Sequence, residues 1–466
     1  AKLGRMHIRE SSFGYWSSPG AFLAVAVGAS LGIGNSARLP YMMSEYGGVL
    51  FLAVYLLCLL VVGIPLLITE WSLGRWMRDD LGAGFRRLAQ AGRSTRAWRW
   101  LGLLMICCAV IVLSYYSVIA GWSLGYLFRG VAGVLGHLDA EGARVTFLSL
   151  ARDPERSLAW HTLFMVVTTV IVSYGFRDGI ERACRQLLPA VLVLSVLLLA
   201  LAMIGSDIGA VWHQMTMPDL GRLGWRGALE ALYQAFFTLG LGLGAMMMLG
   251  GYLPSDVNLV RLAGAVAVID TLFGLIVGFA LLMVLDQAGI ESSGGLVFLF
   301  QDFPHAIAAG GLGAAIAGLF YGLLFLVTLM AATALLEPVT RRLMERHRQT
   351  RVFASVGAAI VIWTLGIGSL LSFGQMADMR VAGQNFFEWM QFLTSFVLVP
   401  VGGLFLCVLV ARVLPPELSR ALWGKRDRVF YQPWLYALRY PARIVLLVVL
   451  LHGFGTFHWL AEFWSE

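Results

Sequence analysis

A succession of long apolar segments, separated by short charged ones, constrains this sequence more than any other feature. A helix that crosses a bilayer needs roughly 20 apolar residues, and eleven segments reach about that length. They are 17–42, 48–77, 99–129, 158–175, 185–205, 227–252, 257–287, 313–344, 352–373, 387–412 and 433–455. Because 59% of the 466 residues are hydrophobic and only 13% are charged, little remains for soluble domains. The sequence predicts an all-α membrane protein with eleven transmembrane helices in one transmembrane domain over 1–466, and excludes most soluble enzymes.

Basic residues are unevenly distributed between the predicted loops. If the N-terminus is cytoplasmic, 26 of the 34 lysines and arginines lie on the cytoplasmic side and 7 on the other. Lysine and arginine accumulate in the cytoplasmic loops of membrane proteins. We therefore predict a multi-pass protein of the plasma (bacterial inner) membrane, with a cytoplasmic N-terminus and the C-terminus outside. The net charge of +7 is explained by this topology, and a nucleic-acid partner is not expected.

The polar chemistry of an enzyme is not apparent in the sequence. The five cysteines lie within or at the ends of apolar segments, and the eight histidines lie mainly at span ends. This distribution argues against a disulfide framework or a zinc site. We expect no enzymatic activity and no organic cofactor, and the sequence leaves the oligomeric state open.

Two of the spans contain closely spaced glycines. They are Gly28, Gly32 and Gly34 in the first span and Gly240, Gly242 and Gly244 in the sixth. Each glycine destabilises a helix interior by about 1 kcal/mol relative to alanine, so both series predict a local break. Unwound backbone at bilayer depth must line a cavity or bind a ligand. We therefore expect helices 1 and 6 to be discontinuous and to form the binding site.

The two predicted breaks lie five spans apart. This spacing predicts an inverted 5+5 repeat, with one half over 17–205, the other over 227–412, and a peripheral helix 11 over 433–455. At each break, free N–H groups and the positive ends of half-helices attract a carboxylate, and free carbonyl groups attract cations.

Short motifs follow one another in a characteristic order along these spans. They include Gly32-Ile33-Gly34-Asn35, Arg38-Leu39-Pro40-Tyr41, Gly63-Ile64-Pro65-Leu66 with Glu70, Tyr115-Tyr116, Asp178-Gly179-Ile180-Glu181-Arg182 and Gln234-Ala235-Phe236-Phe237-Thr238-Leu239. Over essentially the whole chain, this order resembles the neurotransmitter:sodium symporter family, whose bacterial members have the leucine-transporter fold. The resemblance implies a secondary active transporter that couples an amino acid or a related small acid to sodium.

The resemblance also implies a substrate pocket between helices 1, 3, 6 and 8. Its positions here are Ala29, Ser30, Gly32, Ile33, Gly34, Val112, Tyr116, Phe237, Thr238, Gly240, Leu243, Ala331 and Leu335. In this family Tyr116 would donate its hydroxyl to the substrate carboxylate, and Phe237 would close the pocket from the outer side. Amine-transporting members carry aspartate at position 32, so Gly32 indicates a substrate that brings its own carboxylate. The mostly apolar lining favours an aliphatic or aromatic amino acid.

One sodium site resembles that of the family with a single change. Its residues would be Ser30, through its backbone carbonyl, with Asn35, Thr238 and Asp270. Oxygen ligands suit a hard cation. Relatives carry asparagine at position 270 and obtain a negative charge from chloride or from an acidic residue at the position of Gly274, so a fixed carboxylate makes chloride unnecessary. The same carboxylate can carry a proton where it is poorly hydrated, which keeps proton-coupled or ion-independent exchange as an alternative.

The second sodium site of the family is poorly preserved. Backbone carbonyls at Gly28, Leu31 and Val327 remain, but Met330 and Ala331 stand where relatives carry a threonine and a serine. Methionine sulfur and a methyl group are poor ligands for a hard cation. We expect the first site to be retained and the second to be degenerate.

The gates on both sides also depart from the family pattern. Arg38 matches the extracellular gate arginine, but Gln391 replaces its aspartate partner and leaves Glu388 as a candidate substitute. On the cytoplasmic side, Phe13 stands where relatives carry the gate arginine, whereas Trp16 and Glu345 match the family. These changes keep a third hypothesis open, a substrate-binding membrane sensor that does not transport.

Overall fold

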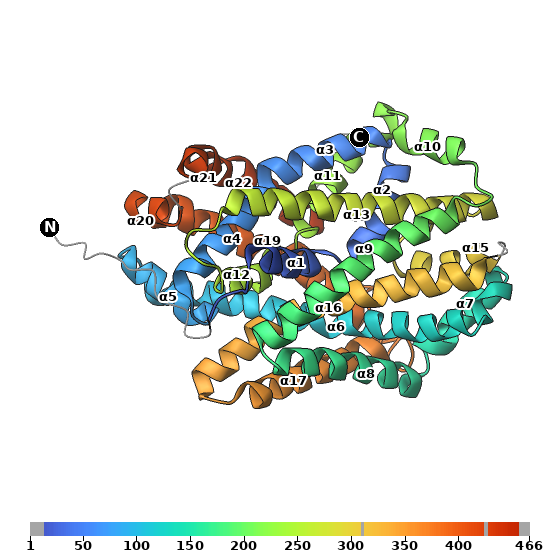
Figure 1. The fold of residues 1–466 in the computed structure, drawn as a ribbon, viewed down its shortest axis with the longest axis horizontal. Coiled ribbons are helices and arrows are strands. Elements are labelled where there is room, and N and C mark those ends of the chain that lie inside the picture. The colour runs from blue at the N-terminus through green and yellow to red at the C-terminus, as the bar shows by residue number, and fades with distance from the viewer. Residues whose placement is uncertain (1–13, 309–311, 424–426, 456–466) are drawn as a thin grey trace.

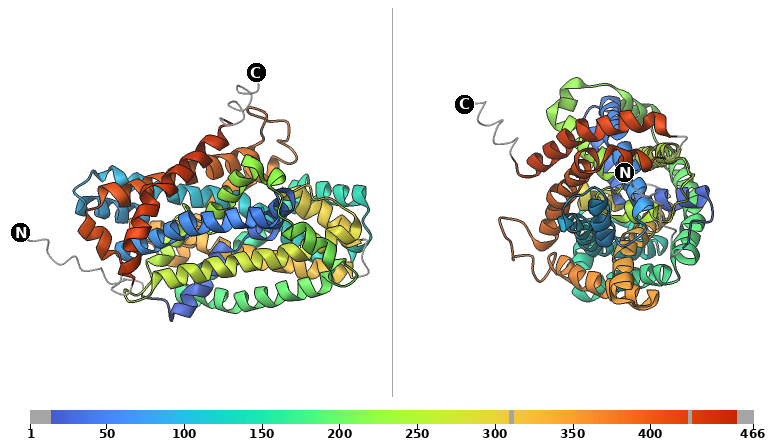
Figure 2. Two further views of the ribbon diagram at one scale, coloured as in Figure 1. Left: turned by 90° about the horizontal axis from the view of Figure 1, so that it is seen from above. Right: turned by 90° about the vertical axis from the view of Figure 1, so that its left-hand side faces the viewer.

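The computed structural model describes residues 14–308, 312–423 and 427–455. Within this part the regular secondary structure is helical, apart from one isolated bridge between Val381 and Gln384. Figure 1 shows the long helices side by side along the long axis, and Figure 2 shows that they form one rounded bundle. The predicted all-α class is confirmed.

Nine helical segments of the described residues are long and apolar enough to cross a membrane. They are α3–η2–α4 (Val49–Met77), η3–α6 (Arg96–Val131), α8 (Pro154–Ser173), η5–α9 (Phe176–Ala202), α13 (Leu259–Ala288), α16 (Gly313–His347), α17 (Arg351–Leu371), α18–η7–α19–η8 (Phe386–Val413) and η9–α21–α22 (Arg428–Gly453). A tenth is the bent pair of α1 (Pro19–Ser30) with η1–α2 (Gly34–Glu45). The remaining expected span, the sixth (227–252), is present as two pieces, α11 (Leu220–Phe237) and α12 (Ala245–Gly250).

The shorter helices lie at the two ends of this bundle. At one end are α5 (Leu81–Ala91) and α20 (Pro416–Ala421), and at the other are α7 (Ala140–Ala151), α10 (Ile208–Thr216) and α15 (Phe303–Ala308) (Figure 1). Further short elements are η4 (Val134–His137), α14 (Gly295–Val297) and η6 (Phe298–Asp302). Two spans begin earlier than predicted. The fourth begins at Pro154 and not at 158, because the Asp153 side chain caps α8. The fifth begins at Phe176 and not at 185, because a π-helical segment over Phe176–Glu181 precedes α9.

Small residues allow the central helices to approach closely. The long helix α16 packs along both α6 and α9, while α6 also packs along α8 and α17. A Cβ atom on Gly121 of α6 would lie 2.8 Å from the backbone of α8, and one on Gly278 of α13 would lie 2.2 Å from Pro40. These glycines are required for helix packing, in agreement with small-residue interfaces in membranes.

Both predicted breaks are confirmed, but their backbones differ. The first is short: α1 ends at Ser30, Leu31 is extended, and helical structure resumes at Ile33. The second spans 238–244, where Gly240, Gly242 and Gly244 all have positive φ, between 62° and 76°. A side chain is unfavourable in that conformation, so these glycines form the break itself.

Gly28 does not belong to the first break. It lies inside α1, and a Cβ atom there would be 3.1 Å from Met330 Sδ and 3.3 Å from Cys184 Sγ. Its lack of a side chain serves close packing of α1 against α16 and α9, which corrects the expectation that all three glycines of this series unwind the helix.

Candidate functional site

A cavity of about 480 Å³ lies between the two helix breaks. All thirteen positions expected to form the substrate pocket line it. They come from α1 and the first break (Ala29, Ser30, Gly32, Ile33, Gly34), from α6 (Val112, Tyr116), from α11 and the second break (Phe237, Thr238, Gly240, Leu243) and from α16 (Ala331, Leu335). Segments far apart in the sequence therefore meet around one space.

The polar end of the cavity is formed by Tyr116 and the first break. The Tyr116 hydroxyl is buried and has no hydrogen-bond partner among the described residues. It lies near the backbone of Ile33, and a Cβ atom on Gly32 would lie 3.2 Å from it. The first N–H groups of the half-helix that begins at Ile33 lack intrahelical acceptors. A phenol hydroxyl and free N–H groups together can bind a carboxylate, provided that position 32 carries no side chain.

The rest of the wall is apolar and adaptable. Val112 and Leu243 are half-buried, while Ala331 and Leu335 present short or flexible groups. The Phe237 ring packs against Tyr233, with centroids 4.2 Å apart. Few polar groups at one end and a mainly hydrophobic wall are typical of a site that orients a small amphiphilic ligand.

A buried carboxylate lies beside the cavity, on α13. Asp270 is fully buried, and Thr238 donates a hydrogen bond of 2.6 Å to its Oδ2. The side chains of Ser30 and Asn35 face the same carboxylate. Asp270 Oδ1 and Asn35 Nδ2 are buried without hydrogen-bond partners in the part of the chain that the structure describes. The structure thus brings together the four residues expected at the first sodium site, and an unpaired carboxylate oxygen among them is suited to a hard cation.

The neighbourhood of Asp270 explains why the charge sits at this position. A Cβ atom on Gly274, one turn along α13, would lie 2.8 Å from Leu39 Cδ2 and 3.4 Å from the Asn35 carbonyl oxygen. A carboxylate at 274 would therefore have to displace Leu39. Tyr55, whose hydroxyl lies 3.2 Å from Thr271 Oγ1, adds a further polar group close to Asp270.

The expected second site has a different chemistry. Met330 fills the space against Gly28, with its Sδ atom 3.1 Å from the place of a Cβ atom. The two nearest hydroxyl groups are turned to their own helix, since Thr328 donates to the Phe325 carbonyl and Thr333 to the Met330 carbonyl. Leu31 lines the cavity, whereas Gly28 and Val327 do not. Only backbone carbonyls and sulfur remain here, so the residues present do not fit a sodium ion.

Arg38, which lines one end of the cavity, has a partner that the sequence did not predict. Its guanidinium contacts Glu230 of α11 at 2.5 Å and lies 4.1 Å from the centroid of the Tyr233 ring. Glu388, the expected substitute, instead forms a capping box with Asn385 at the start of α18. Glu388 is thus corrected from a gate residue to a helix cap, while Gln391 lines the cavity together with Arg38.

Trp16 is held against the segment around α12 by two hydrogen bonds. Its indole Nε1 donates to the Leu249 carbonyl at 3.0 Å, and its backbone N–H donates to Tyr252 at 3.2 Å. Ser17 donates two hydrogen bonds to the Glu181 carboxylate. The expected gate position Phe13 lies outside the described residues.

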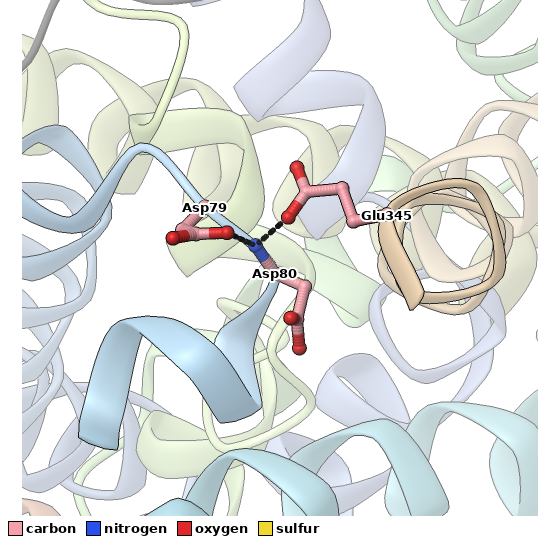
Figure 3. A group of neighbouring side chains, drawn as sticks. All are labelled: Asp79, Asp80 and Glu345. Atoms are coloured by element: carbon pink, nitrogen blue, oxygen red, sulfur yellow. Dashed lines mark hydrogen bonds between the residues drawn. The ribbon is translucent and has the colours of Figure 1, made fainter. Parts of the chain in front are cut away.

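Glu345 belongs to a group of three carboxylates with Asp79 and Asp80 (Figure 3). Glu345 and Asp79 both accept a hydrogen bond from the backbone N–H of Asp80. The three charges are balanced by three arginines: Arg87 pairs with Asp79, Arg342 with Asp80 and Arg341 with Glu345. The cluster is therefore an ion-pair network that joins α16 to the start of α5.

Comparison with known proteins agrees with this geometry. The family model described as the sodium:neurotransmitter symporter family matches residues 14–142 and 148–453. The chain belongs to this family. It is similar to the sodium-dependent transporter YhdH of Bacillus subtilis, with 29% identity over 94% of this chain and 97% of that one.

Two further members of the family are informative. The bovine sodium-dependent neutral amino acid transporter B(0)AT2 is 29% identical over 52% of this chain and 36% of its own length. The crystal structure of MhsT in complex with L-phenylalanine superposes with a TM-score of 0.85, at 32% identity, over 94% of this chain and 99% of that one. This match confirms the leucine-transporter fold.

Within this family fold, two buried acids have structural roles that the sequence alone did not assign. Glu70 of α4 accepts a 2.6 Å hydrogen bond from the Gly242 N–H and so holds the second break. Glu337 of α16 accepts a hydrogen bond from Tyr252 and pairs with Arg351 of α17. The available signal was an acidic residue inside an otherwise apolar span, which is costly unless it is paired.

Proposed function

We propose that this chain is a secondary active transporter that carries apolar amino acids together with one sodium ion and without chloride. The main supporting observation is the unpaired Tyr116 hydroxyl that faces Gly32, next to the buried cluster of Asp270, Thr238 and Asn35. The first arrangement suits the carboxylate of a substrate, and the second suits a hard cation. The relatives named for sodium dependence and for neutral amino acids, and the complex of MhsT with L-phenylalanine, support the same substrate class.

The size and polarity of the cavity favour larger apolar side chains. A volume of about 480 Å³ exceeds the needs of a small polar amino acid. Each methylene group buried against this wall contributes about 0.8 kcal/mol, so several apolar amino acids would compete. We expect leucine, methionine and phenylalanine to displace one another, whereas displacement by polar amino acids alone would refute the assignment.

The test is uptake of labelled phenylalanine into liposomes that contain the purified full chain. An inward sodium gradient should drive accumulation, a potassium gradient should not, and replacing chloride by gluconate should have no effect. Binding without any flux would instead support the membrane-sensor hypothesis.

Proton coupling is the second candidate, and one observation favours it. Asp270 is fully buried, and within the described part of the chain no lysine, arginine or histidine forms a salt bridge with it. A buried unpaired carboxylate is unfavourable, so this group would take up a proton whenever no cation balances it. Uptake driven by a pH gradient in the absence of sodium would support this alternative over sodium symport.

We further propose that the end of the bundle with α5 and α20 faces the cytoplasm of a bacterial cell, since the predicted inside loops carry most of the arginines. Modification of single introduced cysteines by an impermeant reagent on intact cells tests this orientation.

A further inference from the structure

The lipid-facing side of the bundle contains a seam between α6 and α19 (Val399–Val408). A Cβ atom on Gly402 would lie 3.1 Å from Leu104 Cδ2 of α6. Nearer the start of α6, the rings of Trp98 and Phe405 contact each other edge to face, with centroids 6.2 Å apart. Since 98 and 104 on one chain segment face 405 and 402 on the other, the two helices run antiparallel along this seam.

Four exposed arginines gather where the seam reaches the bundle end that carries α5. Arg96 and Arg99 stand at the start of η3–α6, and Arg412 stands in η8 (Leu409–Val413), which continues α19. Arg93 joins them, because a Cβ atom on the preceding Gly92 would lie 3.2 Å from the Val413 carbonyl oxygen. We call these four residues the basic end of the seam.

Within the described residues, no carboxylate balances the charge of this basic end. The sequence has no aspartate or glutamate in 81–138 or in 389–416, and none of its four arginines is in a salt bridge with another described residue. By contrast, Arg87, Arg341 and Arg342 each pair with a carboxylate. A topological preference for basic loops does not by itself require unpaired arginines from two distant segments to converge.

Apolar and aromatic groups continue from the basic end along the seam. Phe405 is 51% exposed and lies seven residues before Arg412, on the helix that η8 continues. Trp100 is 59% exposed, and the guanidinium of Arg99 lies over its ring at 5.0 Å. Exposed tryptophan beside arginine is typical of the membrane–water interface. A molecule that occupies this seam would contact positive charge at one end and hydrocarbon-like surface along its length.

We propose that the basic end of the seam binds an anionic phospholipid, with its headgroup phosphate on the arginines and an acyl chain along Phe405. Guanidinium groups form charge-assisted, often bidentate hydrogen bonds with phosphate. Free phosphate would satisfy only the arginines, and an apolar ligand only the aromatic groups, so a phospholipid is the partner that fits both parts.

Native mass spectrometry of the detergent-purified full chain tests this binding, with phosphatidylglycerol as the probe and phosphatidylcholine as the neutral comparison. The test variant is Arg93→Gln/Arg96→Gln/Arg412→Gln. The matched control is Arg177→Gln/Arg182→Gln/Arg261→Gln, which removes the same number of exposed arginines elsewhere. Each basic residue near the membrane surface contributes roughly fivefold in affinity, so we expect a loss on the order of 100-fold in the test variant and little change in the control.

The outcomes separate a lipid site from general electrostatics. Retained phosphatidylglycerol binding in the test variant, or an equal loss in the control, would overturn the proposal. Inorganic phosphate at the same concentration should not displace the lipid, and displacement would show that the acyl chain does not contribute. Thermal unfolding of each variant verifies that all are folded, which is expected because the substituted side chains are exposed.

Discussion

The two sodium sites expected beside the first helix break differ in the side chains that surround them. On one side, the side chains of Ser30, Asn35 and Thr238 face the carboxylate of Asp270. On the other, Met330 Sδ packs against Gly28, and the nearby threonine hydroxyls are satisfied by their own helix. Both lie at the same α1 backbone, so the backbone alone does not make an ion site. The side chains of α13 and α16 decide between a cation site and an apolar contact.

At the polar site, the negative charge of α13 lies at Asp270 and not at position 274. Leu39 occupies the space that a side chain at Gly274 would need, whereas Asp270 one turn earlier contacts Thr238 directly. A charge carried by the protein has a fixed position and is always present, unlike a bound anion. The comparison therefore predicts strong dependence on Asp270 and weak dependence on chloride.

Replacing Asp270 should have the largest effect of the changes considered, a loss of sodium affinity. We expect Asp270→Asn to lower sodium affinity by roughly 150-fold or more, because removing one partner of a buried charged pair costs about 3–5 kcal/mol. Sodium-dependent binding of labelled phenylalanine measures the effect. Asp286→Asn is the matched control, since Asp286 is an exposed residue on the same helix. Equal sodium dependence in both variants would remove Asp270 from the ion site.

Substrate and sodium should be linked through the break that they share. Tyr116→Phe removes one unpaired hydroxyl, and a hydrogen bond to a charged group contributes about 1.5–3 kcal/mol, so we expect substrate affinity to fall roughly tenfold or more. Coupling is reciprocal, and the apparent sodium affinity measured with substrate present should fall as well. The control is Tyr115→Phe, because the Tyr115 hydroxyl has a partner in the protein, Thr394 Oγ1 at 3.4 Å. If Tyr115→Phe has the larger effect, the carboxylate is bound elsewhere.

The expected loss of the second sodium site can be tested by introducing the two side-chain hydroxyl groups that relatives carry there. In Met330→Thr/Ala331→Ser, two hydroxyl groups return to the place where sulfur and a methyl group stand now. We expect the sodium dependence of uptake to become steeper, with the number of ions per substrate rising from one towards two. Met330→Leu conserves volume without adding oxygen and should cost less than about 1.5 kcal/mol of stability. A sodium dependence that is already steep in the unchanged protein would contradict the loss of this site.

The sequence predicted the features that depend on neighbouring residues better than those that depend on tertiary contacts. The second break was predictable because its glycines act locally through positive φ. Gly28 was misassigned because its reason is tertiary, the contact with Met330 and Cys184. The Asp270 cluster was within reach because buried charge is rare in apolar spans, and motif order placed its neighbours. The partner of Arg38 could not be predicted from the sequence. Glu230 and Glu388 are both acidic residues, and only the packing of the helices determines which of them contacts Arg38.

The ion pair of Arg38 with Glu230, like Asp270, has its carboxylate at a position other than the one expected from the family, but its energetic contribution is smaller. The side chains of Arg38 and Glu230 are 31% and 23% exposed, and partly exposed ion pairs contribute only about 0.2–1 kcal/mol. Glu230→Gln should therefore change substrate dissociation by no more than about fivefold, measured by displacement of labelled phenylalanine. Glu388→Gln is the control, because it weakens the cap of α18 and leaves the Arg38 contact intact. An effect on dissociation confined to Glu388→Gln would place the gate on the helix that begins with α18 and show that the charge had not moved to α11.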